Sequence, residues 1–356
     1  MIKINGKKIF NISVMSFSIG LLIYFCVSEN GLVDLMHNIT DFNKIWLSTA
    51  LFCHVLNIFI DAYLTYRFTK SSNSEYSFKE AFKVCMVGQF FSAITPGASG
   101  GQPMQLYCMA NQGIDPGNAT SSLVQKFLVY QSSITMYSTV SLILKFSMFR
   151  ENIGNFMKGM AVFGFCSQAF VILLLILFSF NKSITFSMIK FIFLMLGKLK
   201  IIKNPEQKIK DLEIQIEYFY ISNSNLYKKP MLVLETYFFT IVQITCMFVV
   251  PYCIYRAFNI QGAKVFDMIA AQAFVTMISS FMPLPGGSGA AEGSFCVFLN
   301  QFFSEQTIKP AVLLWRVITY FFTILMSFPF SRVKNKTLEV KSNAQHSRNQ
   351  CYSSRL

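Results

Sequence analysis

The chain has 356 residues, of which 53% are apolar and 16% aromatic. Only 13% of the residues are charged, against about 25% in ordinary soluble domains. This composition excludes a water-soluble enzyme, because too little polar surface remains to cover the molecule, and it predicts an integral membrane protein. The net charge of +14 allows three explanations at first, namely nucleic acid, anionic lipid and membrane topology.

Six apolar stretches are long enough to cross a bilayer core of about 30 Å, which needs roughly 20 residues per helix. The first follows three lysines, but no small-x-small cleavage site follows Cys26, so we expect an uncleaved first helix. The chain is therefore predicted to be an all-α polytopic membrane protein with one transmembrane domain over residues 1–330. The predicted spans are residues 9–28, 45–66, 119–149, 156–180, 231–256 and 309–330.

Two further apolar regions are interrupted by Pro and Gly. Residues 81–112 contain a short helical pattern, the breaker TPGASGGQP and a second short pattern, and residues 265–303 repeat this order around MPLPGGSGAAEG. Non-helical backbone at membrane depth is tolerated only where protein or a water-filled cavity satisfies its polar groups. Each region is therefore predicted to form a broken or re-entrant helical hairpin whose break points into the protein. Eight crossings with two discontinuous helices are the alternative.

The basic residues concentrate in four segments, residues 1–9, 67–80, 181–230 and 331–356, which together carry the whole net charge of +14. Cytoplasmic segments of membrane proteins are enriched in Lys and Arg. These four segments, both termini included, are therefore predicted to be cytoplasmic. The remaining loops, which are predicted to face outward, are residues 29–44, 150–155 and 257–264. Topology thus explains the charge, and we expect no nucleic-acid partner.

This topology makes the two hairpins enter from opposite sides of the membrane. Opposed, interrupted segments in the two halves of a chain indicate an inverted-repeat transporter with its site near the midplane. Residues 181–230 alternate Lys with apolar residues, which is typical of an interfacial amphipathic helix and equally of a basic loop with one helical stretch. The polar tail, residues 331–356, is predicted to be disordered.

Charged side chains inside spans are costly in lipid and are therefore functional candidates. Asp61 lies in the second span, Glu292 follows the second break and Arg316 lies in the last span. A carboxylate and an Arg that face one cavity would bind a zwitterionic or cationic headgroup and its phosphate. A structural ion pair between Glu292 and Arg316 is an equal alternative. Further charges within apolar runs are Lys126, Lys145 and Glu235.

The glycines of the two breaks are a second kind of candidate. Free backbone N–H groups at the N-terminus of a short helix attract an anion such as lipid phosphate, whereas close helix crossing through small residues is the competing explanation. Neither break matches a nucleotide-binding loop, and the nine cysteines lack metal-site spacing, so we expect no cofactor. The candidates are Gly97, Gly100, Gly101, Gly286, Gly287 and Gly289.

The sequence GQFFSAITPGASGGQP, followed by PLPGGSGAAEG and an Arg in the final span, resembles the membrane domain of the lysylphosphatidylglycerol synthase family. This domain is the flippase-like part of bacterial multiple peptide resistance factor, and the resemblance extends from the first span to about Phe330. It implies an intramembrane acid at Asp61 and signature positions at Thr95, Pro96, Gly97, Gly100, Gly101, Pro103, Pro283, Pro285, Gly286, Gly287, Gly289, Glu292 and Arg316.

The resemblance implies that full-length members carry a cytoplasmic acyltransferase-type domain, which moves lysine from lysyl-tRNA to phosphatidylglycerol. It also implies that their membrane domain moves the product between leaflets. Only 26 residues follow Phe330, so we expect no such catalytic domain here. The leading hypothesis is a flippase-like protein of the bacterial plasma membrane that translocates an aminoacylated or anionic phospholipid, such as lysyl-phosphatidylglycerol.

Two alternatives belong to other functional classes. The first is a phosphatidylglycerol lysyltransferase, or the membrane subunit of one whose catalysis is supplied by a separate acyltransferase. The second is a structural or regulatory membrane protein whose breaks serve packing only. The sequence leaves open whether the protein forms a homo-oligomer.

Overall fold

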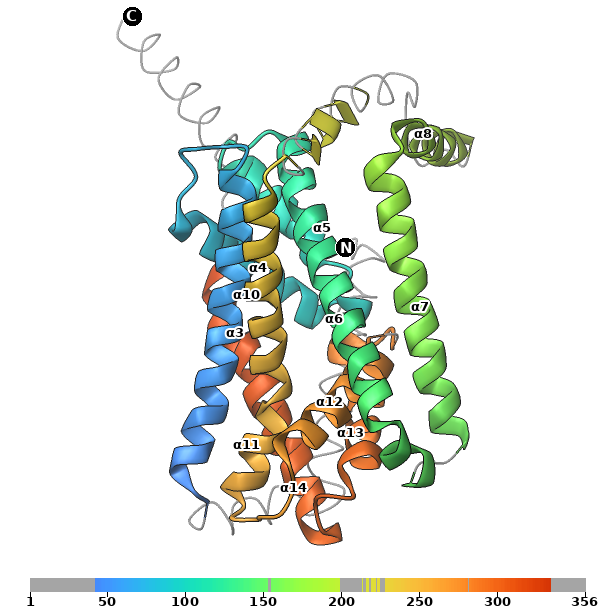
Figure 1. The fold of residues 1–356 in the computed structure, drawn as a ribbon. Helices are drawn as coiled ribbons and strands as arrows, with labels where there is room; N and C mark the ends of the chain where they lie inside the picture. The colour runs from blue at the N-terminus through green and yellow to red at the C-terminus, as the bar shows by residue number, and fades with distance from the viewer. Residues whose placement is uncertain are drawn as a thin grey trace, which may run out of the picture.

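The computed structural model describes residues 42–333, except 153–154, 199–212, 214–215, 218, 222, 225–227 and 281. In this part of the chain all regular secondary structure is helical and there is no strand. The long helices lie side by side in one bundle (Figure 1). The prediction of an all-α fold is therefore confirmed, whereas the predicted first span over residues 9–28 lies outside the described residues.

Four helical stretches are long and apolar enough to cross a membrane, and a fifth results if one bent helix pair is counted as a single span. Three of the four are Lys44–Lys70, Pro116–Lys145 and Pro230–Ala257, and the last is Glu305–Phe330. They coincide with four predicted spans. The described residues thus support several apolar spans, and the predicted total of six stays a prediction.

The long helices begin where local chemistry favours a start. The helix α3 (Lys44–Lys70) begins after Asn43, whose side chain accepts a hydrogen bond from the Ile45 N–H, and α10 (Pro230–Phe248) has Pro in its first turn, where no amide donor is needed. The other helices outside the hairpins are α6 (Pro116–Asn152), α7 (Asn155–Phe180), α8 (Lys182–Lys198), α11 (Val250–Ala257), α14 (Glu305–Arg316), the π-helical turn η3 (Val317–Phe321), α15 (Phe322–Ser327) and η4 (Phe328–Phe330).

Both predicted breaks interrupt a pair of short helices. The first hairpin consists of α4 (Phe78–Ile94), the 3-10 turn η1 (Pro96–Ala98) and α5 (Gly101–Asn111). Its helices have 17 and 11 residues, which is fewer than a full crossing needs. Since α4 and α5 also pack along each other, the first hairpin folds back on itself.

The second hairpin repeats this construction. It consists of α12 (Val265–Ser279), the 3-10 turn η2 (Pro285–Gly287) and α13 (Ala290–Leu299). Its helices have 15 and 10 residues and pack along each other. The lengths and packing of the two hairpins are compatible with re-entrant forms, and the choice between these and eight crossings with two discontinuous helices stays a prediction.

The two hairpins lie in opposite halves of the bundle and meet in the middle. In Figure 1, α5 lies toward the end where α6 begins, whereas α12 and α13 lie in the half that contains α11 and α14. The turns η1 and η2 contact each other, and η2 also contacts α4. This arrangement agrees with the predicted opposition of the breaks, whereas an internal inverted repeat and the orientation in the membrane stay predictions.

The helix α8 covers the first part of the predicted basic segment. The segment Lys182–Met188 is bent by 102° from Ala169–Phe178 of α7, and α8 lies beside the end of α7 at the outer edge of the bundle (Figure 1). A helix at a right angle to the spans has the orientation that an interfacial helix requires. The remainder of residues 181–230 lies largely outside the described residues.

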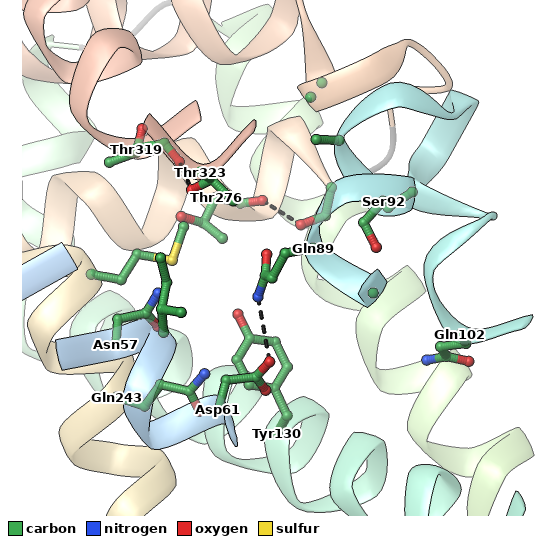
Figure 2. A pocket seen from close by; sticks show the side chains of 18 of the residues that line it. Asn57, Asp61, Gln89, Ser92, Gln102, Tyr130, Gln243, Thr276, Thr319 and Thr323 are labelled. Carbon is green, nitrogen blue, oxygen red and sulfur yellow. Dashed lines mark hydrogen bonds between the residues drawn. The ribbon is translucent and has the colours of Figure 1, made fainter. Parts of the chain in front are cut away.

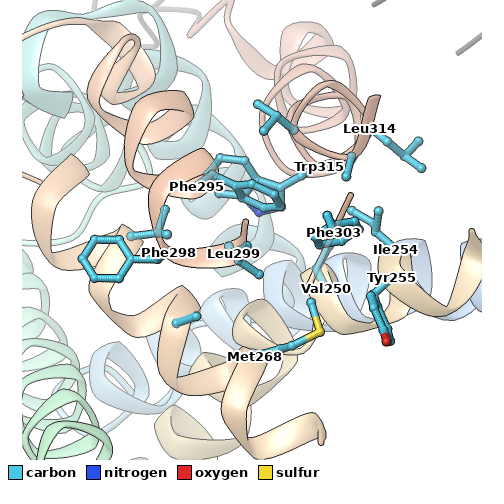
Figure 3. Packing of buried hydrophobic residues seen from close by; sticks show 14 of the residues in the cluster. Val250, Ile254, Tyr255, Met268, Phe295, Phe298, Leu299, Phe303, Leu314 and Trp315 are labelled. Carbon is cyan, nitrogen blue, oxygen red and sulfur yellow. The ribbon is translucent and has the colours of Figure 1, made fainter. Parts of the chain in front are cut away.

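The largest apolar core holds the second hairpin in place. Figure 3 shows how side chains of α11, α12, α13 and α14 pack together. The rings of Phe295 and Trp315 are 5.0 Å apart and those of Phe274 and Phe298 are 5.3 Å apart. Aromatic pairs at such distances stabilise the packing beyond the area that they bury. The second hairpin is therefore anchored by α13 to the final span.

Candidate functional site

A cavity of about 620 Å³ lies where the two breaks meet. Its walls come from α3, α4, α5, α6, α10, α12, the final span and both breaks. Gly97 and Ala98 of the first break and Gly286 and Gly287 of the second line it together. Non-helical backbone thus surrounds an internal space, as expected for such backbone at membrane depth.

One ion pair lies in the cavity wall. Lys126 Nζ of α6 lies 2.8 Å from Asp61 Oδ1 of α3 and donates to Thr65 Oγ1 at 3.0 Å. Asp61 Oδ2 accepts hydrogen bonds from Cys85 Sγ at 2.9 Å and from Gln89 Nε2 at 3.4 Å. The predicted acid thus lines the cavity, and its basic partner is Lys126.

About half of the lining residues are neutral and polar, and most of the others are apolar or glycine. Figure 2 shows Asn57 and Gln243 beside Asp61, with Thr319 and Thr323 on the final span nearby. These side chains offer hydrogen-bond donors and acceptors without net charge. The neutral polar residues that line the cavity are Asn57, Gln89, Ser92, Gln102, Gln105, Tyr130, Gln131, Gln243, Thr276, Ser279, Ser280, Thr319, Tyr320 and Thr323.

In the first break, most of the predicted residues shape the turn. Thr95 Oγ1 donates to the Phe91 carbonyl at 2.6 Å and accepts from the Gly100 N–H at 2.8 Å. A Cβ at Gly101 would lie 1.9 Å from Ser92 Oγ, so this position needs glycine for close packing. Pro96 begins η1 and Pro103 lies in α5 on an exposed position. Of the candidates in this break, Gly97 is the one that lines the cavity.

In the second break, the charged candidates pair with each other behind the cavity. Arg316 Nε lies 2.8 Å from Glu292 Oε1, and these side chains are 6% and 4% exposed. Arg316 Nη1 donates to the Gly286 carbonyl at 2.9 Å, and Glu292 accepts from the Gly289 N–H at 2.6 Å. Neither charge lines the cavity. This geometry favours the alternative of a structural ion pair, and direct contact with a headgroup stays a prediction.

The glycines and prolines of this break fit the close approach of the final span. Gly286 has φ +63°, and a Cβ there would lie 2.3 Å from the Tyr320 ring. Gly287 has φ +63° as well, and its Cβ would lie 2.8 Å from the Ser279 carbonyl oxygen. Left-handed backbone of this kind favours glycine. Pro285 is buried at the start of η2, and Pro283 is exposed just before it.

Tyr320 connects the two hairpins and was not singled out in the sequence. Its hydroxyl donates to the Ala93 carbonyl of α4 at 2.9 Å, while its ring lies against Gly286 of η2. It belongs to the π-helical turn Val317–Phe321. Such turns occur frequently at functional sites. A π turn gives no clear pattern in a single sequence, so Tyr320 could not have been found that way.

The other charged residues within spans form pairs outside the cavity. Glu235 accepts from the Tyr63 hydroxyl at 2.5 Å and forms an ion pair with Arg67. Lys145 Nζ lies 2.6 Å from Asp267 Oδ1. None of these residues lines the cavity. Among the described residues, no group of three His, Cys, Asp or Glu side chains is arranged to hold a metal ion.

The family model for the transmembrane region of lysylphosphatidylglycerol synthase matches residues 10–327. The chain belongs to this family. This match confirms the resemblance to the lysylphosphatidylglycerol synthase family that the two breaks indicated. A relative from Archaeoglobus fulgidus, described as a UPF0104 membrane protein, is 24% identical over 304 residues, which cover 82% of this chain and 84% of the relative. The family thus includes an archaeal protein whose description names no activity.

Proposed function

We propose that the protein translocates a phospholipid between membrane leaflets, with the headgroup passing through the cavity between the two hairpins. The observation that carries this proposal is the position of the cavity, a space of about 620 Å³ among apolar helices that is bounded by both breaks and lined in part by carboxamides and hydroxyls. Moving a polar headgroup through hydrocarbon without hydrogen-bond partners is costly. A wall of carboxamides and hydroxyls lowers this cost.

The two hairpins supply a way to alternate access. The breaks η1 and η2 contact each other, and each hairpin extends from there toward a different end of the bundle (Figure 1). Movement of one short hairpin against the rest would open the cavity toward one leaflet, and movement of the other would open it toward the opposite leaflet. Tyr320, which contacts both hairpins, would have to release one of them for such a movement.

The family and the sequence suggest the lipid and the location. We take the substrate to be an aminoacylated or anionic phospholipid, phosphatidylglycerol or its lysyl derivative, in the plasma membrane of a bacterium with both termini cytoplasmic. The proposal needs neither a cofactor nor nucleic acid, and passive movement suffices for it. Asp61 and Gly97 from the first half and Gly286 and Gly287 from the second would face the headgroup.

A second candidate is a membrane subunit of a synthase, which the description of the family as a synthase region favours. In that case the cavity would present phosphatidylglycerol to a separate acyltransferase. Formation of lysyl-phosphatidylglycerol from lysyl-tRNA by the purified chain would establish an enzyme. Formation only after addition of a co-purified soluble acyltransferase would support the subunit.

The translocation proposal is tested by reconstituting the full chain into liposomes that contain phosphatidylglycerol labelled on an acyl chain. Quenching by a membrane-impermeant reductant reports how fast inner-leaflet lipid reaches the outside. We expect faster exchange than in empty liposomes, and a clear loss in the double variant Asn57→Leu with Gln131→Leu, which removes two carboxamides from the wall. Exchange at the rate of empty liposomes would refute the proposal.

A further inference from the structure

We propose that the cavity binds a lipid phosphate together with one positive charge, and that His54 supplies this charge as a bound proton when the headgroup has none of its own. This inference rests on the proposed function, because it concerns the headgroup that the translocation cavity binds. Three features support it, namely the balanced charge of the wall, a spare N–H group on Lys126 and an unpartnered nitrogen on His54.

The fixed charges of the cavity wall cancel. Asp61 and Lys126 are the carboxylate and the ammonium group among the described lining residues, and they lie 2.8 Å apart. A phosphodiester adds one negative charge to this neutral pair. Burial of an ion without an opposite charge is far more costly than burial of a balanced set of charges. A phosphate therefore needs one further positive charge when it enters the cavity.

Lys126 is the group of the wall that binds the phosphate in this proposal. Its ammonium has three N–H donors, and two of them have acceptors among the described residues, at Asp61 Oδ1 and Thr65 Oγ1. The third donor is left for a phosphate oxygen. Asp61 has partners besides Lys126, because its Oδ2 accepts from Cys85 and Gln89. Contact between Lys126 and a phosphate therefore does not leave this carboxylate unpaired.

His54 carries the atom that takes up the proton. This residue lines the cavity and is 4% exposed. Its Nε2 lies 2.8 Å from Thr323 Oγ1, and that hydroxyl donates its single proton to the Thr319 carbonyl at 2.8 Å. Nε2 must therefore be the donor, which makes Nδ1 the basic nitrogen of the neutral imidazole. Nδ1 has no hydrogen-bond partner among the described residues, so a proton binds there without breaking a contact.

The other titratable groups that share the wall with His54 or contact its neighbours on α3 do not take up this proton. Asp61 is already paired with Lys126. Phenols and thiols are neutral over the pH range in which an imidazole gains its proton. These groups are Tyr130 of α6 and Tyr320 of η3 in the wall, Cys85 of α4 beside Asp61, and Cys246 of α10 and Cys253 of α11 beside Cys53.

The source of the positive charge divides phospholipids into two classes. A headgroup that contains an ammonium group, such as choline or a lysyl ester, brings the compensating charge with it, so His54 stays neutral. A glycerol headgroup brings none, so phosphatidylglycerol needs the proton on His54. A phosphate and a proton that cross together carry no net charge. Movement of phosphatidylglycerol through the cavity should therefore depend on pH and not on the membrane potential.

The first test measures exchange of acyl-labelled phosphatidylglycerol and phosphatidylcholine by the full chain in liposomes between about pH 5 and pH 8. We expect exchange of phosphatidylglycerol to rise at least about tenfold toward acid pH and that of phosphatidylcholine to change less than about twofold. The same pH profile for both lipids, above the rate of empty liposomes, would overturn this inference but leave translocation intact. Rates at the empty-liposome level would overturn both. Uptake of labelled glycerol phosphate without lipid exchange would assign the cavity to a soluble phosphate ester, and it would also overturn both.

The variant His54→Gln tests whether this residue holds the proton. Gln keeps an N–H donor for Thr323 but takes up no proton. We expect exchange of phosphatidylglycerol to lose its pH dependence and to fall about tenfold at acid pH, while exchange of phosphatidylcholine changes less than about twofold. Cys53→Ser, at the preceding position and outside the cavity lining, should keep the pH profile. A pH dependence retained in His54→Gln would overturn the assignment.

The membrane potential gives a second readout that needs no variant. At acid pH, a potassium diffusion potential should leave exchange of phosphatidylglycerol by the unaltered chain unchanged, because the lipid crosses with its proton. In His54→Gln the lipid crosses as an anion, and the same potential should change its rate at least about twofold in the direction set by its sign. Exchange by the unaltered chain that follows the potential at acid pH would overturn the inference.

Discussion

At the scale of single residues, the structure separates charges that face the cavity from charges that hold the fold. Asp61 and Lys126 line the cavity, whereas Glu292 and Arg316 are buried behind it and bind the backbone of the second break. Both pairs are ionic and intramembrane, so residue type alone does not distinguish them. The two pairs differ in position, because only the Asp61–Lys126 pair borders the cavity.

The Asp61–Lys126 pair gives a stability prediction. Lys126→Met leaves a buried carboxylate without its partner, and we expect a loss of about 3–5 kcal/mol. The double variant Asp61→Asn with Lys126→Met removes both charges and should recover most of this loss. Thermal unfolding in detergent measures the difference. As a control, the exposed pair Lys182–Glu217, with side chains 52% and 58% exposed, should cost about 0–1 kcal/mol when broken. A double variant no more stable than Lys126→Met would contradict this assignment.

Gly286 gives a second prediction at this scale. In Gly286→Ala the new Cβ would lie 2.3 Å from the Tyr320 ring, and the left-handed backbone adds strain. We expect a loss of about 1–3 kcal/mol from overpacking and a lower unfolding temperature. Gly113→Ala is a matched control, because Gly113 has φ +88° and a Cβ added there would meet nothing within 4 Å. Equal losses at the two positions would show that the Tyr320 contact is unimportant.

The sequence was informative about some residues and not others. Asp61 was found because an acid in a span is unusual, and the glycine breaks were found from their composition. His54, Asn57 and Asp61 recur every three or four residues on α3 and all line the cavity, so helical periodicity of polar residues would have indicated Asn57 too. The pairing of Lys126 with Asp61 depends on the contact between α3 and α6, which no local pattern reports.

At the scale of elements, the two short hairpins and the final span form the moving parts of the proposed mechanism. The final span changes from α-helix to a π turn at Val317–Phe321, and this turn presents Tyr320 to the first hairpin and to Gly286. The hairpins were predictable because Pro and Gly interrupt apolar runs. The π turn was not, because its residues, VITYF, are compatible with an ordinary helix.

Tyr320→Phe tests the role of this element. The variant keeps the ring against Gly286 but loses the 2.9 Å hydrogen bond to the Ala93 carbonyl. A hydrogen bond of this kind contributes about 0.5–1.5 kcal/mol, so we expect the hairpins to separate more readily and lipid exchange in liposomes to accelerate by about two- to tenfold. Tyr63→Phe, which removes a hydroxyl outside the cavity, should leave the rate unchanged. An exchange rate in Tyr320→Phe equal to that of the unaltered chain would contradict the idea that this hydrogen bond holds the hairpins together.

At the scale of the whole molecule, the predicted topology would account for the net charge of +14 without nucleic acid, because it places the four basic segments in the cytoplasm. The all-helical fold and the family were predictable, because hydropathy reports spans directly and the paired breaks are specific. Which side chains form the cavity wall was not predictable from the sequence. It is assembled from helices of both halves of the chain and from both breaks, and its neutral wall arises from tertiary packing.

The opposed hairpins predict the accessibility of engineered thiols. In a chain freed of its native cysteines, Lys79→Cys at the start of α4 should react with an impermeant reagent from the cytoplasmic side, and Lys264→Cys before α12 from the outer side. Positive-inside orientation is the reason. Labelling of both positions from one side in oriented vesicles would contradict the topology.

The most direct test of the central claim is to join the two breaks and measure lipid movement. Ala98 and Leu284 line the cavity from opposite breaks, so Ala98→Cys with Leu284→Cys in a cysteine-free chain can be bridged by a reducible bifunctional reagent. If the headgroup passes between the hairpins, exchange of acyl-labelled phosphatidylglycerol in liposomes falls to the protein-free rate when bridged and returns on reduction. Exchange that continues unchanged in the bridged protein would contradict the account.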